Sequence, residues 1–581
     1  MPLSRTIPVD GAAGLASVIV KVNNVEIPRS MNLMHVVVYR EANRIARATL
    51  FIMDGSASTG DFPASNEATF LPGNEIEIQM GYNNTNEKVF KGVVVKHNIK
   101  IRSAGSPLLC IECMDKLAKL SISRKNKYFA EMTDSEVIED MISTAGLEAD
   151  VEATTVKHKE LVQYYCTDWD FIITRAEANG KLCFTEDGVL VIKKPDFSQP
   201  PALDLLFGST IIELDAEMDA RNQVSTVASN GWDHSAQAMV TASAMEPGFP
   251  EPGNIFSSDL AGVFKADPYL LQHGGAMAET ELQAWADAQL MKNRLSKIRG
   301  RVKFQGYAGV MPGQVITLGG IGQRFNGDVF VSGVRQEMKN GLWHTDIQFG
   351  LSPQWFAEQH EVTHTAASSV IPGIKGLHIG VVTDLEDPDG AYRVKVKLPE
   401  ISTEEEGTWA RMASFYAGAD RTAFFRPEIG DEVIIGFLHE DPNYPVILGS
   451  LHSAANASPE AHSNDNYIKK IHTASKLELA FDDDKKSITI QTPGGKVITI
   501  DDNGSLIRIE DENGNKITME PAAVKIESAA ALELKAATEL KFAAPNITIK
   551  SDAVCEVSGG ASLKLSSSGT CVVQGSLVQI N

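Results

Sequence analysis

The sequence has few cysteines and no long apolar run. Its 581 residues include only six cysteines, too few to hold so long a chain together by disulfides. No stretch of about 18 consecutive apolar residues occurs, so no segment is expected to cross a bilayer as a helix. Residues 1–14 lack the apolar core of a secretory signal. We expect reduced cysteines and assembly in the cytoplasm, with any export carried out by another machine.

Positive charge is also scarce. The chain has 53 Lys and Arg against 75 Asp and Glu, a formal net charge of −22. Such a chain repels phosphate backbones, so the composition disfavours nucleic-acid binding. A single core stops growing at roughly 250–300 residues, so the length predicts several domains.

Residues 1–365 predict a β-rich region with two related barrels, at about 1–130 and 215–355. Short strands of alternating apolar residues occupy most of both ranges. Two segments share one layout, because Leu71-Pro-Gly and Met311-Pro-Gly each lead into an alternating strand. Between the barrels, residues 131–214 form an α/β insert in which Thr133-Asp-Ser-Glu136 begins a helix.

A Ser/Thr-rich linker separates this region from a smaller all-β unit. The linker covers residues 363–369 and is followed by Pro372 and Gly373. Residues 373–455 contain about five short strands, which fits a Greek-key barrel of the OB type.

Apolar residues recur as i, i+2 pairs through the last hundred residues. Each pair is one face of a short strand, and Gly, Asn, Asp, Ser or Ala turns separate the strands. From Ile517 onward the first members are 7 or 8 residues apart. The pairs are Ile488/Ile490, Ile498/Ile500, Ile507/Ile509, Ile517/Met519, Val524/Ile526, Leu532/Leu534, Leu540/Phe542, Ile547/Ile549, Cys555/Val557 and Leu563/Leu565.

One such octad supplies one strand and one corner, whereas a β-helix needs about three faces to enclose a core. A lone chain would expose these pairs at about 1.5–3 kcal/mol for each large apolar side chain. We therefore predict that residues 466–581 form an intertwined trimeric β-helix with cyclic symmetry. A monomeric β-solenoid of ordinary coil length is the alternative. The expected fold class is mainly β throughout.

Residues 527–544 favour a different structure when they are taken alone. They are rich in Ala, Leu, Glu and Lys, which are good helix formers. Leu532/Leu534 and Leu540/Phe542 keep the flanking repeat in register, so we expect the period to prevail over helix propensity.

A dense series of motifs lies between Gly380 and Leu451. It comprises Asp387-Pro-Asp, Arg393-Val-Lys-Val, Trp409-Ala-Arg-Met, Phe425-Arg-Pro-Glu-Ile-Gly-Asp-Glu-Val433 and Pro445-Val-Ile-Leu-Gly-Ser450. This series resembles the OB domain of VgrG and phage baseplate spike proteins. The preceding half is similar to the phage late-control and hub family, through Tyr165-Cys-Thr-Asp-Trp-Asp-Phe-Ile-Ile-Thr-Arg-Ala-Glu-Ala-Asn-Gly180, Asn230-Gly-Trp-Asp233 and Met311-Pro-Gly.

The resemblance implies the structural hub and spike of a contractile injection system. In this family, two barrels per subunit form a pseudo-sixfold ring that seats the inner tube, followed by an OB collar and a membrane-piercing needle. The implied partners are two sister subunits, the inner tube protein, baseplate proteins and effector cargo. Delivery out of the cell or into a target follows sheath contraction.

The needle is expected to carry neither an enzyme nor a cofactor. Only residues 452–466 separate collar and needle, too few for the catalytic domain of some phage spikes. No His lies beyond His472, so the His-x-His iron site of some needle tips is absent. The resemblance therefore implies a blunt tip that receives a PAAR-like cap, at Leu577, Val578, Gln579, Ile580 and Asn581.

The competing enzymatic hypothesis is a zinc-dependent hydrolase. His360-Glu361-Val-Thr-His364 fits the H-E-x-x-H pattern, which on a helix places two zinc ligands on one face. Val362, Thr363 and the Ser/Thr run after them are poor helix formers, so we expect no zinc site there.

Other chemical motifs have simpler structural interpretations. Cys110-Ile-Glu-Cys113 continues an apolar run and is expected in a core, and Cys555 and Cys571 are expected inside the needle. Asp501-Asp-Asn-Gly504 and Asp511-Glu-Asn-Gly514 fit tight turns better than calcium loops.

Two further non-enzymatic functions compete with the spike. Residues 373–452 hold 7 Lys and Arg against 14 Asp and Glu, the opposite sign to a single-strand-binding OB fold. An adhesive trimeric fibre remains an alternative, and copurification with sheath and tube would distinguish it from a spike.

Overall fold

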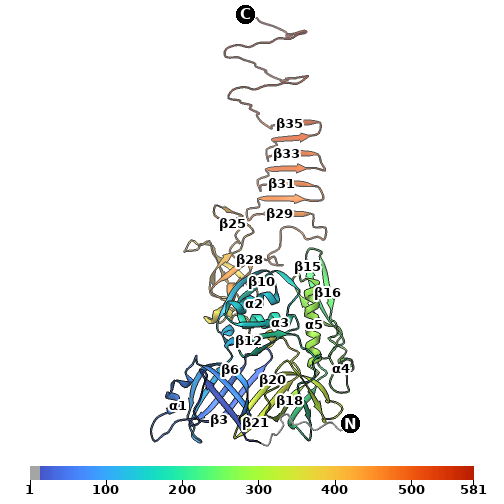
Figure 1. Cartoon of the computed structure of the whole chain (residues 1–581). Helices are drawn as coiled ribbons and strands as arrows, with labels where there is room; N and C mark the ends of the chain where they lie inside the picture. Colours follow the sequence, from blue (N-terminus) through green and yellow to red (C-terminus); the bar gives the residue numbers. More distant parts are fainter. Residues whose placement is uncertain (1–13, 581) are drawn as a thin grey trace. The chain divides into compact units, whose positions relative to one another are not determined.

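The computed structural model describes residues 14–580, and it is mainly β as expected (Figure 1). The chain divides into two compact units, Met1–Ile374 and Lys375–Asn581. Among the described residues, no helix is both long and apolar enough to span a bilayer.

A thirteen-stranded sheet dominates the first unit. Eleven strands follow the order β14-β18-β21-β20-β3-β4-β7-β6-β5-β1-β2, and β13 and β19 are attached through β20. Their bounds are β1 Ala16–Val22, β2 Val25–Glu26, β3 Asn32–Glu41, β4 Arg47–Met53, β5 Glu75–Tyr82, β6 Thr85–Lys100, β7 Leu108–Met114, β13 Asp204–Leu206, β14 Ile211–Met218, β18 Ile298–Gln305, β19 Val315–Gly319, β20 Gly327–Lys339 and β21 Leu342–Phe349.

The two predicted barrel regions share this sheet. Strand β20 pairs with β21 on one side and with β3 on the other, where Gly333 to Lys339 lie opposite Glu41 to His35. Each region still has its own core: Leu50 and Ile78 are buried in the first, and Phe304 and Ile347 in the second. The long β20 strand thus joins what the sequence suggested were two separate barrels.

The Pro-Gly turns have the same geometry in both regions. Gly73 has φ +102° and Gly313 has φ +90°, a left-handed conformation that favours glycine. The Gly73 amide donates to the Val94 carbonyl at 2.8 Å, and the Gly313 amide donates to the Val331 carbonyl at 2.8 Å. These matching hydrogen bonds support the internal repeat inferred from sequence.

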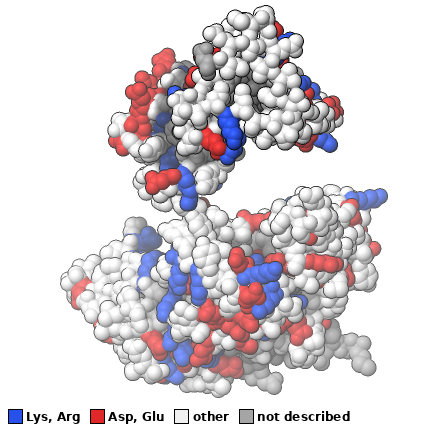
Figure 2. Space-filling model, turned by 90° about the horizontal axis from the view of Figure 1, so that it is seen from above, with Lys and Arg blue, Asp and Glu red and all other residues white. Residues whose placement is uncertain are grey.

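One face of the large sheet carries the two buried apolar cores, and the opposite face is lined by ion pairs. On the second face Arg301 lies 2.9 Å from Asp215, and Lys303 lies 3.0 Å from Glu213. Acidic and basic side chains are interspersed over the surface drawn in Figure 2, which shows no broad basic patch. Paired charges of this kind are typical of a solvated face.

The predicted insert packs two helices against short strands. Thr133 caps α2 with the reciprocal capping box that the sequence predicted, and α3 begins after its N-cap residue Thr167. The smaller elements described in the first unit are the strands of three small sheets, five helices and several short helical turns. Their bounds are α2 Asp134–Thr144, α3 Asp168–Ala178, β8 Arg124–Thr133, β9 Glu148–Val151, β10 Lys157–Thr167, β11 Leu182–Glu186, β12 Val189–Lys193, β15 Val227–Asp233, β16 Ala238–Ser243, β17 Tyr269–His273, α4 Ser257–Phe264, α5 Glu279–Leu295 and α6 Phe356–Gln359, with short helical turns at α1 Pro63–Asn66, η1 Ala68–Phe70, η2 Lys116–Ser121 and η3 Ala366–Ser369.

The second unit begins with a closed five-stranded barrel in the order β22-β23-β24-β28-β27. Alternate residues such as Val394, Val396 and Ile435 fill its interior and are fully buried. This is the small barrel predicted for residues 373–455. Its elements are β22 His378–Asp384, β23 Val394–Lys397, β24 Thr408–Met412, β27 Glu432–Phe437 and β28 Pro445–Ser450, with the hairpin β25 Ala417–Gly418 and β26 Arg421–Thr422 and the turn η4 Leu438–Glu440.

A seven-stranded antiparallel sheet follows the barrel in sequence. Each strand pairs with the next along the chain, from β29 to β35. The strands are β29 Ile468–His472, β30 Glu478–Asp482, β31 Ser487–Gln491, β32 Val497–Asp501, β33 Leu506–Glu510, β34 Lys516–Glu520 and β35 Ala523–Glu527. Residues 528–580 contain neither strand nor helix within the chain.

A buried ionic network in the insert offers a test of this fold. Asp134 accepts hydrogen bonds from Arg175 at 2.6 Å and Asn179 at 2.9 Å, and lies 3.0 Å from His158. Burial acts to raise the pKa of Asp134, but these contacts hold it well below its ordinary value.

We expect Asp134→Ala to lower the free energy of unfolding by about 3–5 kcal/mol, because Arg175 is left as a buried charge without its main partner. The control is Asp140→Ala, on the same helix as Asp134, which removes an exposed ion-pair partner of Lys127. It should lower the free energy of unfolding by less than about 1 kcal/mol. Urea unfolding measures both, and equal losses would contradict the network's role. Because the pKa of Asp134 is depressed, its contribution is complete above about pH 4 and is lost as the pH falls through the folded-state pKa.

Candidate functional site: an apolar ladder along the second unit

The apolar pairs predicted from sequence align in columns across β31–β35. Ile488 lies opposite Ile500, and Ile490 lies opposite Ile498. The next strand continues both columns, since Ile500 faces Ile507 and Ile498 faces Ile509. Ile517, Met519, Val524 and Ile526 extend them through β34 and β35. We call this face the apolar ladder.

The opposite face of the same sheet is polar. Thr489 pairs with Thr499, which pairs with Arg508 on the next strand. Arg508 then faces Thr518, and Thr518 faces Lys525. The sheet is therefore amphipathic, as the period-two pattern predicts.

The sequence pattern as first defined misses the first rung of the ladder. Leu479 and Phe481 on β30 lie opposite Ile490 and Ile488. They form an i, i+2 pair like the others, so the same pattern was available to find them. The apolar ladder therefore begins one strand earlier than predicted.

The apolar ladder is uncovered within one chain. Ile490 is 47% exposed and Ile526 is 51% exposed. Apolar faces of this extent on a folded chain are typical of interaction surfaces.

Residues 528–580, the described residues beyond β35, make no backbone pairing with the rest of the chain. None of the backbone–backbone hydrogen bonds involves residues 528–580 within the described chain. The apolar pairs continue there and are more exposed still, with Phe542 at 66% and Leu565 at 75%. Figure 1 shows this segment winding as an open coil toward the C-terminus.

The tail thus has two regimes where the sequence suggested one repeat. Up to Ile517 the first members of the pairs are 9 or 10 residues apart, long enough for a five-residue strand and a hairpin turn. The seven-residue step from Ile517 to Val524 still closes the β34–β35 hairpin, whereas the steps of 7 or 8 residues after Val524 have no Asn-Gly or Asp-Gly turn and form no hairpin among the described residues. The stretch 527–544, rich in helix formers, is not helical, as expected, but beyond Glu527 it forms no strand within one chain either.

The two acidic segments weighed as calcium loops are hairpin turns. The Asp501 carboxylate accepts a hydrogen bond from the Gly504 amide at 2.7 Å. Asp511 accepts from the amides of Asn513 and Asn515, both at 2.9 Å. Their carboxylates are occupied by the backbone of their own turns.

The His360–His364 segment does not have zinc-site geometry. Helix α6 ends at Gln359, and His360 is an extended residue at its C-cap. The His360 ring lies tilted against Phe356 with 4.6 Å between ring centroids, whereas His364 packs edge-on against Tyr164 at 5.8 Å between centroids. Within residues 14–580, no group of three or more His, Cys, Asp or Glu side chains is arranged to hold a metal ion.

The cysteines of the first unit are mostly buried in apolar surroundings. Cys110 and Cys113 lie on β7 and are each 1% exposed. Burial raises the pKa of both thiols. The prediction of core cysteines is confirmed for this pair. Cys555 and Cys571 are exposed in the single chain, so their place inside a needle remains a prediction.

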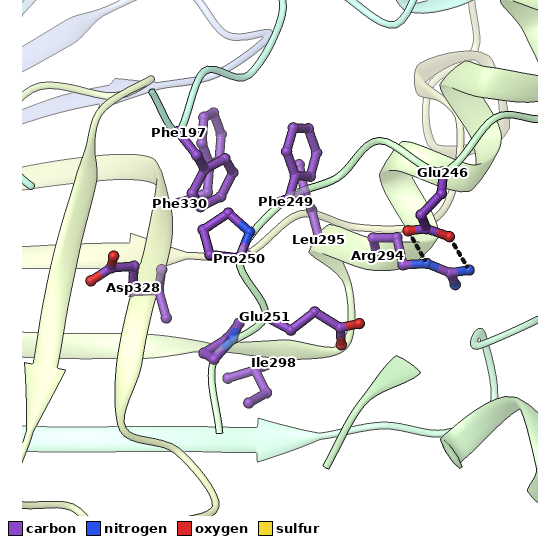
Figure 3. A pocket seen from close by; sticks show the side chains of 13 residues that line it. Phe197, Glu246, Phe249, Pro250, Glu251, Arg294, Leu295, Ile298, Asp328 and Phe330 are labelled. Carbon is purple, nitrogen blue, oxygen red and sulfur yellow. Dashed lines mark hydrogen bonds and ion pairs between the residues drawn. The ribbon is translucent and has the colours of Figure 1, made fainter. Parts of the chain in front are cut away.

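A small cavity in the first unit is a packing seam (Figure 3). Phe197 lies against Phe249 at 4.8 Å and Phe330 at 6.2 Å between ring centroids. Arg294 donates two hydrogen bonds to Glu246, at 2.8 and 2.9 Å, at one side of the cavity. The volume of about 30 Å³ holds about one water molecule, not a substrate.

A larger hollow of about 630 Å³ lies beside α5. Burial lowers the pKa of its Lys181 ammonium, which pairs with Glu152 at 2.8 Å. Asp287, which also lines the hollow, accepts hydrogen bonds from the Met245 amide and the Gln283 side chain. No Ser, Cys or His is among the described residues that line this hollow.

The described part of the predicted tip is exposed. Leu577 and Ile580 are 82% and 89% exposed, and Val578 is 47% exposed. Asn581 lies outside the described residues. The tip assignment therefore stays a prediction.

The sequence pattern also missed an exposed aromatic group in the second unit. Phe415, Phe424 and Phe425 flank the β25–β26 hairpin and are all more than half exposed. Their common signature is aromatic residues on both sides of an Ala-Gly-Ala-Asp turn.

Three family models match this chain. The Alg8 N-terminal domain matches residues 12–340, more than half of the chain. The type VI secretion system/phage-baseplate injector OB domain matches residues 378–452, and the phage baseplate V C-terminal trimerisation domain matches residues 487–581. The chain belongs to the Alg8 N-terminal domain family and, through its other domains, to the VgrG hub-spike family.

Individual relatives agree with this assignment over shorter stretches. The chain is 33% identical over 108 residues to the type VI secretion system spike protein VgrG3 of Vibrio cholerae, covering 17% of this chain and 11% of that protein. It is 26% identical over 196 residues to the spike protein VgrG1a of Pseudomonas aeruginosa, covering 31% of this chain and 30% of that protein. The matches thus span less than a third of these relatives.

Among solved structures, this chain is similar to a tail protein from Neisseria meningitidis, at 16% identity and a TM-score of 0.44. The superposition covers 58% of this chain and 98% of that protein's chain.

If Asp511 stabilises a hairpin turn, the stability of the tail should depend on Asp511 and on pH but not on calcium. Hydrogen bonding from Asn515 lowers the pKa of Asp511 below its ordinary value. We expect Asp511→Ala to lower the melting temperature of the VgrG-like tail, whereas calcium and a chelator should leave the wild-type value unchanged. The stabilisation by Asp511 is present above the ordinary Asp pKa and is lost as the pH falls through the depressed one. A calcium-dependent shift in differential scanning calorimetry would contradict the turn interpretation.

Proposed function

We propose that this chain is the homotrimeric hub and spike of a contractile injection system, which connects an inner tube to a membrane-piercing needle. The observation that carries the proposal is the exposed apolar ladder and its continuation as an unpaired tail. The family match to a trimerisation domain at residues 487–581 supports it.

Three copies supply the hydrogen-bond partners and the apolar contacts that a single chain lacks. The amides and carbonyls of residues 528–580 need hydrogen-bond partners once their apolar side chains are buried. Sister subunits supply strands above and below each rung, and their apolar pairs close the interior. In β31–β35 the same symmetry packs three amphipathic sheets with their ladders inward and their threonine faces outward.

The trimer serves a mechanical function. Strands hydrogen-bonded around one apolar axis resist bending, because any kink breaks backbone pairs and exposes core side chains. Such a needle transmits the thrust of a contracting sheath to a target envelope. The thirteen-stranded sheet of the hub, with its ion-paired face, provides the wider base on which the inner tube protein and baseplate proteins dock.

Delivery is assigned to binding and not to catalysis. The tip at 577–581 receives a PAAR-like cap, and effector cargo travels with the spike. The protein assembles in the cytoplasm and leaves the cell as part of the apparatus. No catalytic group is needed at any of these steps.

Mass measurement tests the trimer directly. We expect light scattering to give three times the chain mass of 62.9 kDa. Ile500→Asp should yield monomers, because it places three charges in the apolar interior and removes three buried side chains worth about 1.5–3 kcal/mol each. Thr499→Asp, the neighbouring position on the outward face of β32, is the matched control and should remain trimeric. A monomeric wild type, or a trimeric Ile500→Asp, would overturn the proposal.

A truncation tests the tip. Removing residues 577–581 should abolish copurification of a PAAR-like protein with the full chain and leave the trimer mass otherwise unchanged. Copurification of the wild type with sheath and tube proteins distinguishes a spike from an adhesive fibre. Retention of the cap after truncation would move its binding site away from the tip.

A further inference from the structure

The tail carries charges at the positions between its paired apolar residues. Neighbouring side chains of a strand point to opposite faces, so these middle residues face outward when the apolar pairs face inward. Successive rungs place there Glu533, Lys541, Thr548, Glu556 and Lys564. An acid is therefore followed by a base on the next rung, twice.

These charges are largely unused within the chain. Lys541 contacts Glu539 at 2.6 Å, and Lys550 lies 3.6 Å from Asp552. Among the described residues, Glu533, Glu556 and Lys564 take part in no ion pair. Each side chain is available to a neighbouring strand.

Threefold winding determines which rungs become neighbours. One rung covers one of three faces, so a chain returns to the same face only after three rungs. Two strands from sister subunits fill the interval, with about 4.8 Å between adjacent strands. By cyclic symmetry, each rung of one subunit stacks against the following rung of a sister subunit.

We infer that the outward charges set the stacking register of the trimeric needle, with Glu556 pairing with the partner subunit's Lys564 and Glu533 with the partner subunit's Lys541. This inference rests on the proposed homotrimer. Across parallel neighbours, opposite charges at facing positions attract, and like charges repel. If equal rungs stacked instead, every charge would face its own kind.

The apolar core cannot make this selection. Every rung presents two apolar side chains of similar kind, so a slip by one rung still buries an apolar pair. The apolar pairs thus drive association, and the charges distinguish one register from another. The interior and the surface of the same strands have separate tasks.

Charge reversal in the full chain tests the register. Glu556→Lys and Lys564→Glu should each lower the temperature at which the trimer dissociates in SDS, by roughly 2–4 °C, because each puts like charges on adjacent strands. The matched double variant Glu556→Lys/Lys564→Glu should return to the wild-type temperature. The mismatched double Glu533→Lys/Lys564→Glu has the same net charge and should fall below either single variant.

The outcomes separate the register from the trimer itself. Rescue by the matched double alone, and its disappearance in 1 M salt, supports the inference. Equal stability of both doubles, or no effect of any variant, overturns the register and leaves the trimer standing. A monomeric wild type would instead overturn the proposed function on which the inference rests.

Discussion

An unclosed strand cannot be stable in water by itself, and this constraint governs the second unit. Residues 528–580 have exposed apolar side chains, and their amides and carbonyls have no backbone partners within the described chain. Folding them in a single chain would leave either the side chains or the backbone without partners. Both needs are met together only when other strands lie directly above and below, which makes association part of folding for this segment.

The β29–β35 sheet meets half of the same constraint within the chain. Its strands satisfy one another's backbone groups, so only the apolar ladder is left to be covered. The β29–β35 sheet is therefore a transition between a barrel closed within one chain and a segment that needs other strands in order to fold. The Asp501 and Asp511 turns allow this intermediate regime, because their carboxylates close hairpins that the later rungs cannot form.

Much of this organisation was visible in the sequence. The cap at Thr133, the small barrel around Val394 and Val396, and the columns built on Ile488 and Ile498 each arise from a local pattern of a few residues. The junction of β20 with β3 was not visible, because it joins residues about 300 positions apart and neither strand differs locally from one that ends a sheet. The hairpin regime was missed for a related reason: an i, i+2 pair identifies a face but not the direction of the next strand.

The candidate site shows the same division. His360-Glu361-Val-Thr-His364 matches a catalytic pattern in letters, but the backbone at His360 has already left the helix, so the two imidazoles have separate neighbours. The apolar ladder, by contrast, was found by periodicity because each of its members is placed by its own strand.

The segment 527–544 shows which influence prevails when local propensity and periodicity disagree. Ala, Leu, Glu and Lys favour a helix by a few tenths of a kcal/mol per residue over β-branched residues. Burying Leu532, Leu534, Leu540 and Phe542 between sister strands contributes about 1.5–3 kcal/mol for each side chain. A helix would scatter these four residues around its circumference, because their spacing of 2 and 8 does not follow its 3.6-residue turn. In the proposed trimer, burial of the four side chains would therefore outweigh helix propensity and favour the extended form. On this proposal, the helix-favouring residues weaken the isolated chain's preference for strands, and the proposed needle keeps its structure through burial of the apolar pairs.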